Sequence, residues 1–61
     1  MTLRQLQSKI RVARESGSAD LGIATLIYHG NCEWAVIAKD GNTIDTAVTA
    51  SPEKQFEYLI G

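Results

Sequence analysis

The feature that most constrains this chain is its small size without covalent or metal reinforcement. It has 61 residues and one cysteine, Cys32, so an internal disulfide cannot form. One cysteine and one histidine also cannot complete a structural zinc site without other ligand types. A core of this size is only marginally stable, and natural chains in this position often gain a second subunit. We therefore expect a single domain over residues 1–61 that forms a homo-oligomer, a dimer first.

The charge of the chain is nearly balanced, with six Lys and Arg, seven Asp and Glu, and a formal net charge of −1. A dedicated binder of the nucleic-acid backbone is normally basic overall, so this balance argues against that class. The longest apolar runs are too short for a signal peptide or a membrane span. We expect a cytoplasmic protein with no membrane attachment, in which Cys32 is reduced and buried.

A first helix over residues 3–16 is predicted by its ends and by its apolar period. Thr2 followed by Gln5 has the spacing of a capping box, and Gly17 marks the expected end. Apolar residues recur between these ends at intervals of three and four, as one helix face requires. They are Leu3, Leu6, Ile10 and Ala13.

Three strands are predicted after a polar connector at residues 16–20. Residues 23–28 and 32–38 are rich in β-branched side chains, and Gly30-Asn31 between them is a two-residue hairpin signal. The third strand, residues 43–49, follows a turn at residues 39–42. A two-residue loop there would place Asp45 among apolar neighbours. We therefore expect a three-residue loop with Gly41 in the left-handed conformation.

A short last helix is predicted after Ser51, with Pro52 at its first position and Phe56, Leu59 and Ile60 on its apolar side. The element order is then α-β-β-β-α. The expected fold class is α+β, with both helices on one face of a three-stranded antiparallel sheet. The residues expected beneath the helices are Ile23, Ile27, Trp34, Val36, Ile44 and Val48.

The opposite face of the predicted sheet is also apolar, although a sheet with one wet face normally alternates apolar and polar residues. The residues assigned to it are Ala24, Leu26, Tyr28, Ala35, Ile37 and Ala47. Scattered exposed aliphatic side chains are common on monomers. A flat apolar surface of this kind nevertheless favours burial, so we expect it to form a dimer interface or to bind a partner protein.

One polar cluster is predicted at the end of the sheet that holds the Gly30-Asn31 turn. The α-β-β-β-α order places both helix starts at this end, and helix N-termini favour anions. The candidate ligand-binding residues are Arg4, His29, Asn31, Ser51 and Lys54. The predicted ligand is small and anionic, or nucleotide-like. The alternative is that Thr2 and Ser51 only cap helices and that His29 is an ordinary turn residue.

A basic stripe lies beside the apolar stripe of the first helix. Its residues are Arg4, Gln7, Arg11 and Arg14, spaced by three and four. It is either a solvated helix face or a surface for nucleic acid, an acidic protein or a nucleotide.

The order and length of the elements resemble the double-stranded RNA-binding domain, whose helices also cover one face of a three-stranded sheet. The resemblance spans nearly the whole chain and rests on topology. It implies that Arg4, Gln7 and Arg11 correspond to first-helix residues that contact RNA. The tight Gly30-Asn31 turn lacks that family's Gly-Pro-x-His loop, and the last helix lacks its lysine cluster. Nucleic-acid binding through the first helix is therefore the alternative function.

No motif for catalysis, a cofactor or a metal stands out. The predicted turn places His29 across from Cys32, but no acid is positioned to orient them, and no Gly-rich phosphate loop is present. We expect a non-enzymatic binding module that self-associates and either captures an anionic ligand or blocks a partner protein. Chains this short are common among bacteriophage and mobile-element accessory proteins, and an inhibitor is the sharpest form of this expectation.

Overall fold

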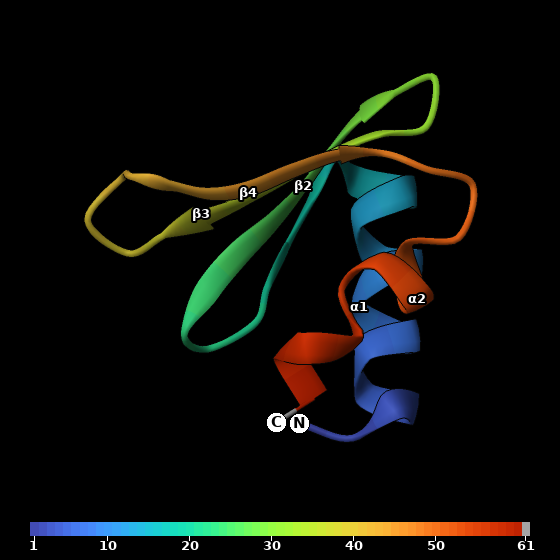
Figure 1. The fold of residues 1–61 in the computed structure, drawn as a ribbon, viewed down its shortest axis with the longest axis horizontal. Coiled ribbons are helices and arrows are strands. Elements are labelled where there is room, and N and C mark those ends of the chain that lie inside the picture. Colours follow the sequence, from blue (N-terminus) through green and yellow to red (C-terminus); the bar gives the residue numbers. More distant parts are fainter. Residues whose placement is uncertain (61) are drawn as a thin grey trace.

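A computed structural model describes residues 1–60 and shows one long helix, four strands and two short helices along the chain (Figure 1). The elements are α1 (Leu3–Ser16), β1 (Ser18–Asp20), β2 (Ala24–Gly30), β3 (Glu33–Ala38), β4 (Thr43–Val48), α2 (Pro52–Gln55) and the 3-10 helix η1 (Glu57–Ile60). The strands form one antiparallel sheet in the order β1-β2-β3-β4. The predicted α+β class is confirmed, and the prediction of three strands is wrong.

Helix α1 begins and ends at the predicted residues. The Thr2 hydroxyl accepts a hydrogen bond from the Gln5 amide at 3.1 Å, and the Gln5 side chain accepts one from the Thr2 amide at 2.8 Å. This reciprocal pair is the predicted capping box. Gly17 ends the helix with φ of 95°, a left-handed conformation that glycine adopts without strain.

Strand β1 occupies part of the segment predicted to be a connector. Its residues alternate exposed, buried and exposed, and Ala19 is the one that enters the core. The turn into β2 closes where the Gly22 amide donates to the Asp20 carboxylate at 2.7 Å. The extra strand adds one reversal of the chain. The start of α1 therefore lies at the far end of the sheet from the β2–β3 turn (Figure 1).

The β2–β3 turn is centred on Asn31 and Cys32 and not on the predicted Gly30-Asn31. Asn31 has φ of 53° and Cys32 has φ of 62°. Positive φ at both central residues is what a type I′ turn requires. Gly30, with φ of 87°, pairs with Glu33, and the register shifts by one residue before it, between Tyr28 and Gly30.

This β-bulge exchanges the two faces of β2 relative to the prediction, because successive strand side chains point to opposite faces. Tyr28, and not Ile27, lies opposite Trp34. Ala24 and Leu26 are consequently buried beneath α1, whereas Ile27 lies on the side of the sheet away from the helices.

A second bulge exchanges the faces of β4. The predicted three-residue loop is present: the Gly41 amide donates to the Ala38 carbonyl at 2.9 Å, and Gly41 has φ of 92°. The register then shifts between Ile37 and Val36, so that Asp45 lies opposite Val36. Ile44 and Val48, predicted to be in the core, are 52% and 76% exposed.

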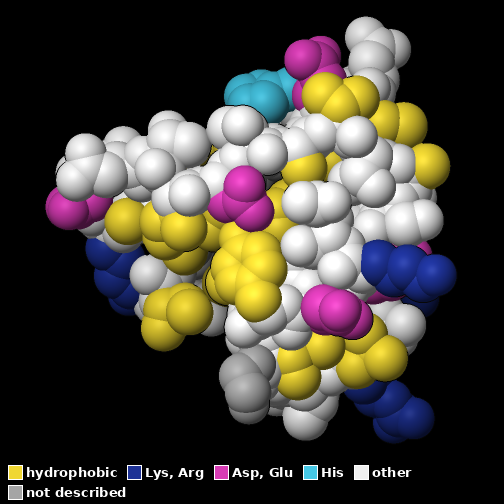
Figure 2. All heavy atoms as spheres, in the orientation of Figure 1, with side chains coloured by type: hydrophobic (Ala, Val, Ile, Leu, Met, Phe, Trp, Pro, Cys, Tyr) yellow, Lys and Arg dark blue, Asp and Glu magenta, His cyan; other side chains and the backbone are white. Residues whose placement is uncertain are grey.

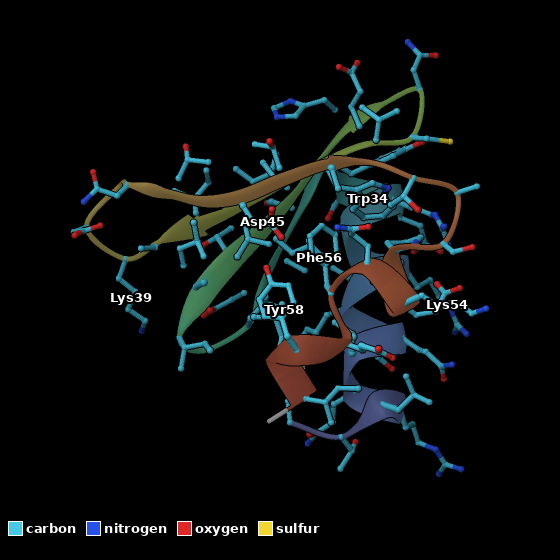
Figure 3. The ribbon with its side chains drawn as sticks, in the orientation of Figure 1. Trp34, Lys39, Asp45, Lys54, Phe56 and Tyr58 are labelled. Atoms are coloured by element: carbon cyan, nitrogen blue, oxygen red, sulfur yellow. The ribbon has the colours of Figure 1, made fainter. Side chains whose placement is uncertain are left out.

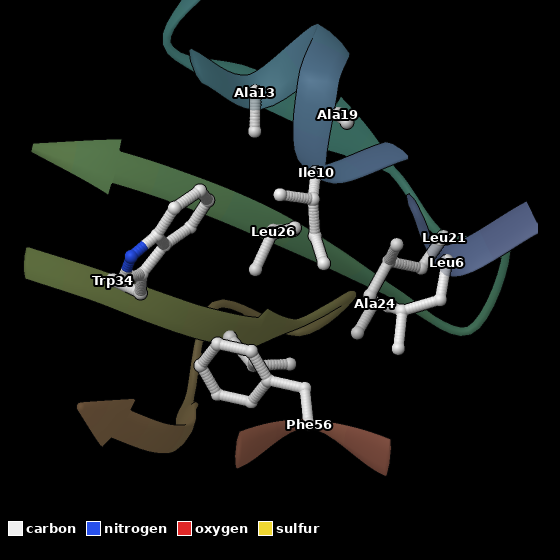
Figure 4. Packing of buried hydrophobic residues seen from close by; sticks show 10 residues of the cluster. Leu6, Ile10, Ala13, Ala19, Leu21, Ala24, Leu26, Trp34 and Phe56 are labelled. Carbon is white, nitrogen blue, oxygen red and sulfur yellow. The ribbon is translucent and has the colours of Figure 1, made fainter. Parts of the chain in front are cut away.

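The core lies between the helices and one face of the sheet (Figure 4). Trp34 and Val36 are buried, as predicted, and the Trp34 indole N–H donates to the Thr49 carbonyl at 3.2 Å. Leu6 and Phe56 bring α1 and the end of α2 onto the same face. The small side chains Ala13, Ala19 and Ala24 lie where α1 meets the first two strands. The residues wrongly predicted to lie beneath the helices are Ile23, Ile27, Ile44 and Val48.

Within residues 1–60, none of the helices combines the length and the apolar character needed to cross a membrane.

The strained position of Cys32 yields a stability prediction. Replacing Cys32 with glycine creates Asn-Gly, the preferred type I′ pair, and removes the side chain from a left-handed position. A non-glycine residue in the left-handed region costs about 1–2 kcal/mol. Glycine avoids this cost but loses more conformational entropy when the chain folds. We therefore expect Cys32→Gly to raise the free energy of unfolding by about 0.5–1 kcal/mol. Urea denaturation measures the change. Cys32→Ser, which keeps the strain and removes the thiol, should leave the midpoint nearly unchanged.

Candidate functional site

The face of the sheet that points away from the helices is called the outer face. Its members follow from the strand register and from which neighbours are buried. They are Ser18 and Asp20 of β1, Thr25, Ile27 and His29 of β2, Glu33, Ala35 and Ile37 of β3, and Thr46 and Val48 of β4.

The centre of the outer face is apolar, and its margins are polar. Ile27 lies beside Ala35 in the middle of the sheet, and Ile37 follows Ala35 on β3. Serine and threonine flank them on β1 and β4. Charged side chains are confined to the two ends, with Glu33 near the β2–β3 turn and Asp20 at the opposite end. The surface is therefore an apolar strip, with Ile27 and Ile37 half-buried and Ala35 buried between its neighbours, and it has a hydroxyl-rich border.

Near the β2–β3 turn the outer face is hollowed. The depression has a volume of about 370 Å³, and its lining includes His29, Glu33, Thr46 and Val48. His29 and Glu33 are the ionisable side chains in it, so it offers one base and one acid but no third group to orient them.

A second hollow, of about 430 Å³, lies between the first turns of α1 and the β1–β2 turn. Its lining includes Gln5, Lys9 and Asp20. None of these three was predicted as a site residue. One cation and one carboxylate in an open hollow do not define a ligand.

The predicted interface is placed differently by the structure. Ala24 and Leu26 are 1% and 0% exposed, so they cannot contact a partner in this fold. Tyr28 stacks on Trp34 with ring centroids 4.4 Å apart, on the helix side of the sheet. Ala35 and Ile37 do lie on the outer face, where Ala35 is only 6% exposed and Ile37 is half-buried. The predicted Ala47 instead packs against the core.

Two interface candidates were missed, Ile27 and Val48. A signal for the correct register of β2 was present in the sequence. The set Thr25, Ile27 and His29 carries two polar residues, whereas the alternate set beginning with Ala24 is more apolar. The more polar set faces solvent, as expected for a sheet covered on one side.

The predicted anion site is not assembled, because Arg4 lies apart from its other members. The Arg14 guanidinium carbon is 5.3 Å from the centre of the Trp34 ring, which places the end of α1 near the β2–β3 turn. Arg4 is ten residues earlier, about 15 Å along the helix axis. The cause is strand β1, which reverses the chain once more than predicted. In Figure 2 the histidine, in cyan, is separate from every Lys and Arg side chain on that face.

Part of the predicted cluster does lie at one end of the sheet. The Thr49 amide donates to the Cys32 carbonyl at 2.8 Å, which brings the approach to Ser51 beside the β2–β3 turn and its Asn31. The Ser51 side chain caps no amide of α2, and this helix has four residues. Lys54 is exposed on α2 (Figure 3).

Cys32 is exposed rather than buried, which corrects the prediction. It lies within the turn, and its amide donates to the Tyr28 hydroxyl at 3.4 Å. The register therefore gives no His29–Cys32 cross-strand pair. Among residues 1–60, no three His, Cys, Asp or Glu side chains converge as a metal site would require.

The basic stripe of α1 is where the sequence predicted it. Arg4, Gln7, Arg11 and Arg14 are all exposed on the helix. Arg14 additionally covers part of the Trp34 ring, a cation–π contact that fixes one end of the stripe.

One polar contact that the sequence did not predict closes the C-terminal segment onto the sheet. The Tyr58 hydroxyl of η1 donates to the Asp45 carboxylate at 2.7 Å (Figure 3). Burial raises the pKa of Tyr58 to about 12, and the hydrogen bond to Asp45 and the charge of that carboxylate act in the same direction. Asp45 thus lies on the helix side of the sheet and has a hydrogen-bond partner there, whereas the prediction pointed it away from that side.

This contact yields a prediction for alkaline pH. Because the pKa of Tyr58 is about 12 in the folded protein and about 10 in an unfolded chain, the folded state holds this proton more tightly. The stabilisation should be complete below about pH 10 and be lost as the pH rises through about 12. Tyrosinate absorbance should show that Asp45→Asn lowers this pKa. Tyr58→Phe should remove this loss from the stability–pH curve, and an unchanged curve would contradict the contact.

No protein-family model, curated protein or solved structure matches this chain.

Proposed function

We propose that this chain is a small binding module that self-associates through the outer face of its sheet. The observation that carries the proposal is the arrangement of layers: α1 and α2 lie on one face, and no element of residues 1–60 covers Ile27, Ile37 and Val48 on the other. Val48 is 76% exposed. Monomeric proteins rarely leave a large contiguous apolar surface in water.

The size of the surface indicates a weak dimer. Strands of three, seven, six and six residues, about 4.8 Å apart and rising about 3.3 Å per residue, give a face of roughly 350 Å² in projection. A standard interface buries about 800 Å² per partner. The outer face alone is therefore smaller than a standard interface, so the association should be weak and should depend on concentration.

Self-association would also support the fold. The accessible surface of residues 1–60 is that of an ordinary folded monomer: 3931 Å² against about 3,900 Å² expected for 6.7 kDa. The monomer is thus not unusually compact, so compactness adds no stability to its small core. A partner that binds only the folded state raises its stability by mass action.

The same surface suits the inhibitory role expected from the sequence. In that role the outer face binds an apolar patch on a target protein in place of a second copy. Capture of an anion forms no part of the proposal, because Arg4 is separated from His29 and Asn31.

The proposal is tested by placing a charge on the outer face. The wild type should pass from monomer to dimer between about 1 μM and about 1 mM in sedimentation velocity. Ile37→Asp should remain monomeric, because the dimer would bury a carboxylate without a partner. Val48→Asp provides a second variant at a site that is already 76% exposed, so its folding is less affected.

The matched control is Val12→Asp, the same chemical change at a residue of α1 that is 46% exposed. It should dimerise as the wild type does. Circular dichroism confirms that each variant is folded. A wild type that stays monomeric at the highest concentration, or a Val12→Asp that dissociates equally, would rule out the outer face.

A second function is favoured by the exposed row of Arg4, Gln7 and Arg11 on α1. If this row binds nucleic acid, Arg4→Glu with Arg11→Glu should abolish retention of a mixed-sequence RNA duplex at low salt. Wild-type affinity should fall steeply as salt rises, since phosphate contacts release counterions. Lys54→Glu, a charge reversal outside the row, is the control. No retention of the duplex by the wild type at low salt would exclude this function.

A further inference from the structure

The two central strands of the outer face carry unlike side chains in every row. Across β2 and β3, Thr25 lies beside Ile37 and Ile27 lies beside Ala35. In the row next to the turn, His29 of the bulge and Glu33 line one hollow. Each row therefore pairs a smaller residue with a larger one, or a base with an acid.

We propose that the second copy packs on this face with its two-fold axis parallel to β2 and β3. This rests on the proposed self-association and adds its geometry. Such an axis exchanges the two columns within each row and keeps every row in place. Ile27 then lies on the partner's Ala35, and Ile37 lies on the partner's Thr25. Larger side chains meet smaller ones, as stacked sheets about 10 Å apart require for interdigitation.

The charges of the outer face favour the same axis. It places His29 over the partner's Glu33, and by symmetry it does so twice. The hollow beside these residues leaves room for both side chains. An axis across the strands would move Glu33 over the far end of β3 and would place His29 over the partner's Thr25, with the partner's Asp20 one strand away instead of an acid directly opposite. Charge pairs at the edge of an interface mainly determine how the two partners are oriented relative to each other.

Charge complementarity also identifies the occupant as a second copy of this chain. The row next to the turn presents one base and one acid, so the surface that matches this row is the same row turned by the two-fold axis. Binding to a different protein would not require each row of this face to contain both members of a complementary pair.

The test uses two single variants that repel themselves and attract each other. In His29→Glu, the new carboxylate lies over the partner's Glu33 in both halves of the homodimer. In Glu33→Lys, the new ammonium lies over the partner's His29. In the mixed dimer, the introduced carboxylate lies over the introduced ammonium. The second contact is an unchanged pair of His29 and Glu33.

Native mass spectrometry of an equimolar mixture measures the proportion of mixed dimer. We expect the squared amount of mixed dimer, divided by the product of the two homodimer amounts, to exceed its statistical value about tenfold, which corresponds to about 1.4 kcal/mol. Contacts within one subunit are the same before and after mixing, so they cannot produce this excess. Mixing His29→Gln with Glu33→Gln, which introduces no charge, should give a clearly smaller excess, because the mixed dimer only regains one wild-type His29–Glu33 pair.

The outcomes separate the geometry from the function. A statistical mixture of charged variants, with a wild type that dimerises and an Ile37→Asp that does not, would overturn the axis and leave self-association in place. A wild type that is monomeric throughout would overturn both.

Discussion

The register of β2 against β3 determines the rest of the structure. It is fixed by a bulge before Gly30 and by the left-handed residues Asn31 and Cys32. Because strand side chains alternate, one extra residue decides which of two complete sets enters the core. The observed set brings Tyr28 into contact with Trp34. The guanidinium of Arg14, from the last turn of α1, lies over the Trp34 ring. The position of α1 on the sheet thus depends on the turn at residues 29–32.

The second bulge, in β4, has a chemical consequence at Asp45. It turns this carboxylate toward the helix side, where a half-buried charge without a partner would be costly. Tyr58 supplies the hydrogen bond and so connects η1 to the sheet edge. Bulges therefore lie on both flanks of β3, and both neighbours of that strand are shifted by one residue relative to simple hairpins.

Features that depend on one segment were predictable, and those that depend on two segments were not. Helix α1 is local, and its capping box and Gly17 located both ends. The prediction that Trp34 and Val36 of β3 lie in the core is confirmed, although it paired Trp34 with Ile27 and not with Tyr28. The faces of β2 and β4 depend on bulges that no propensity signals, and only the polarity of Thr25 and His29 pointed to the observed face of β2. Strand β1, three residues long, is too short for a periodic pattern, and missing it misplaced Arg4 relative to the β2–β3 turn.

The composition of the outer face separates two explanations for its β-branched residues. Such residues favour strands in any environment, because their side chains are stiff and suit the pleated surface. Threonine meets that need without exposing apolar surface, and Thr25 and Thr46 do so here. Isoleucine or valine at positions 27, 37 and 48 goes beyond what strand propensity requires. Their restricted rotamers also lose little entropy on binding, which suits the proposed self-association.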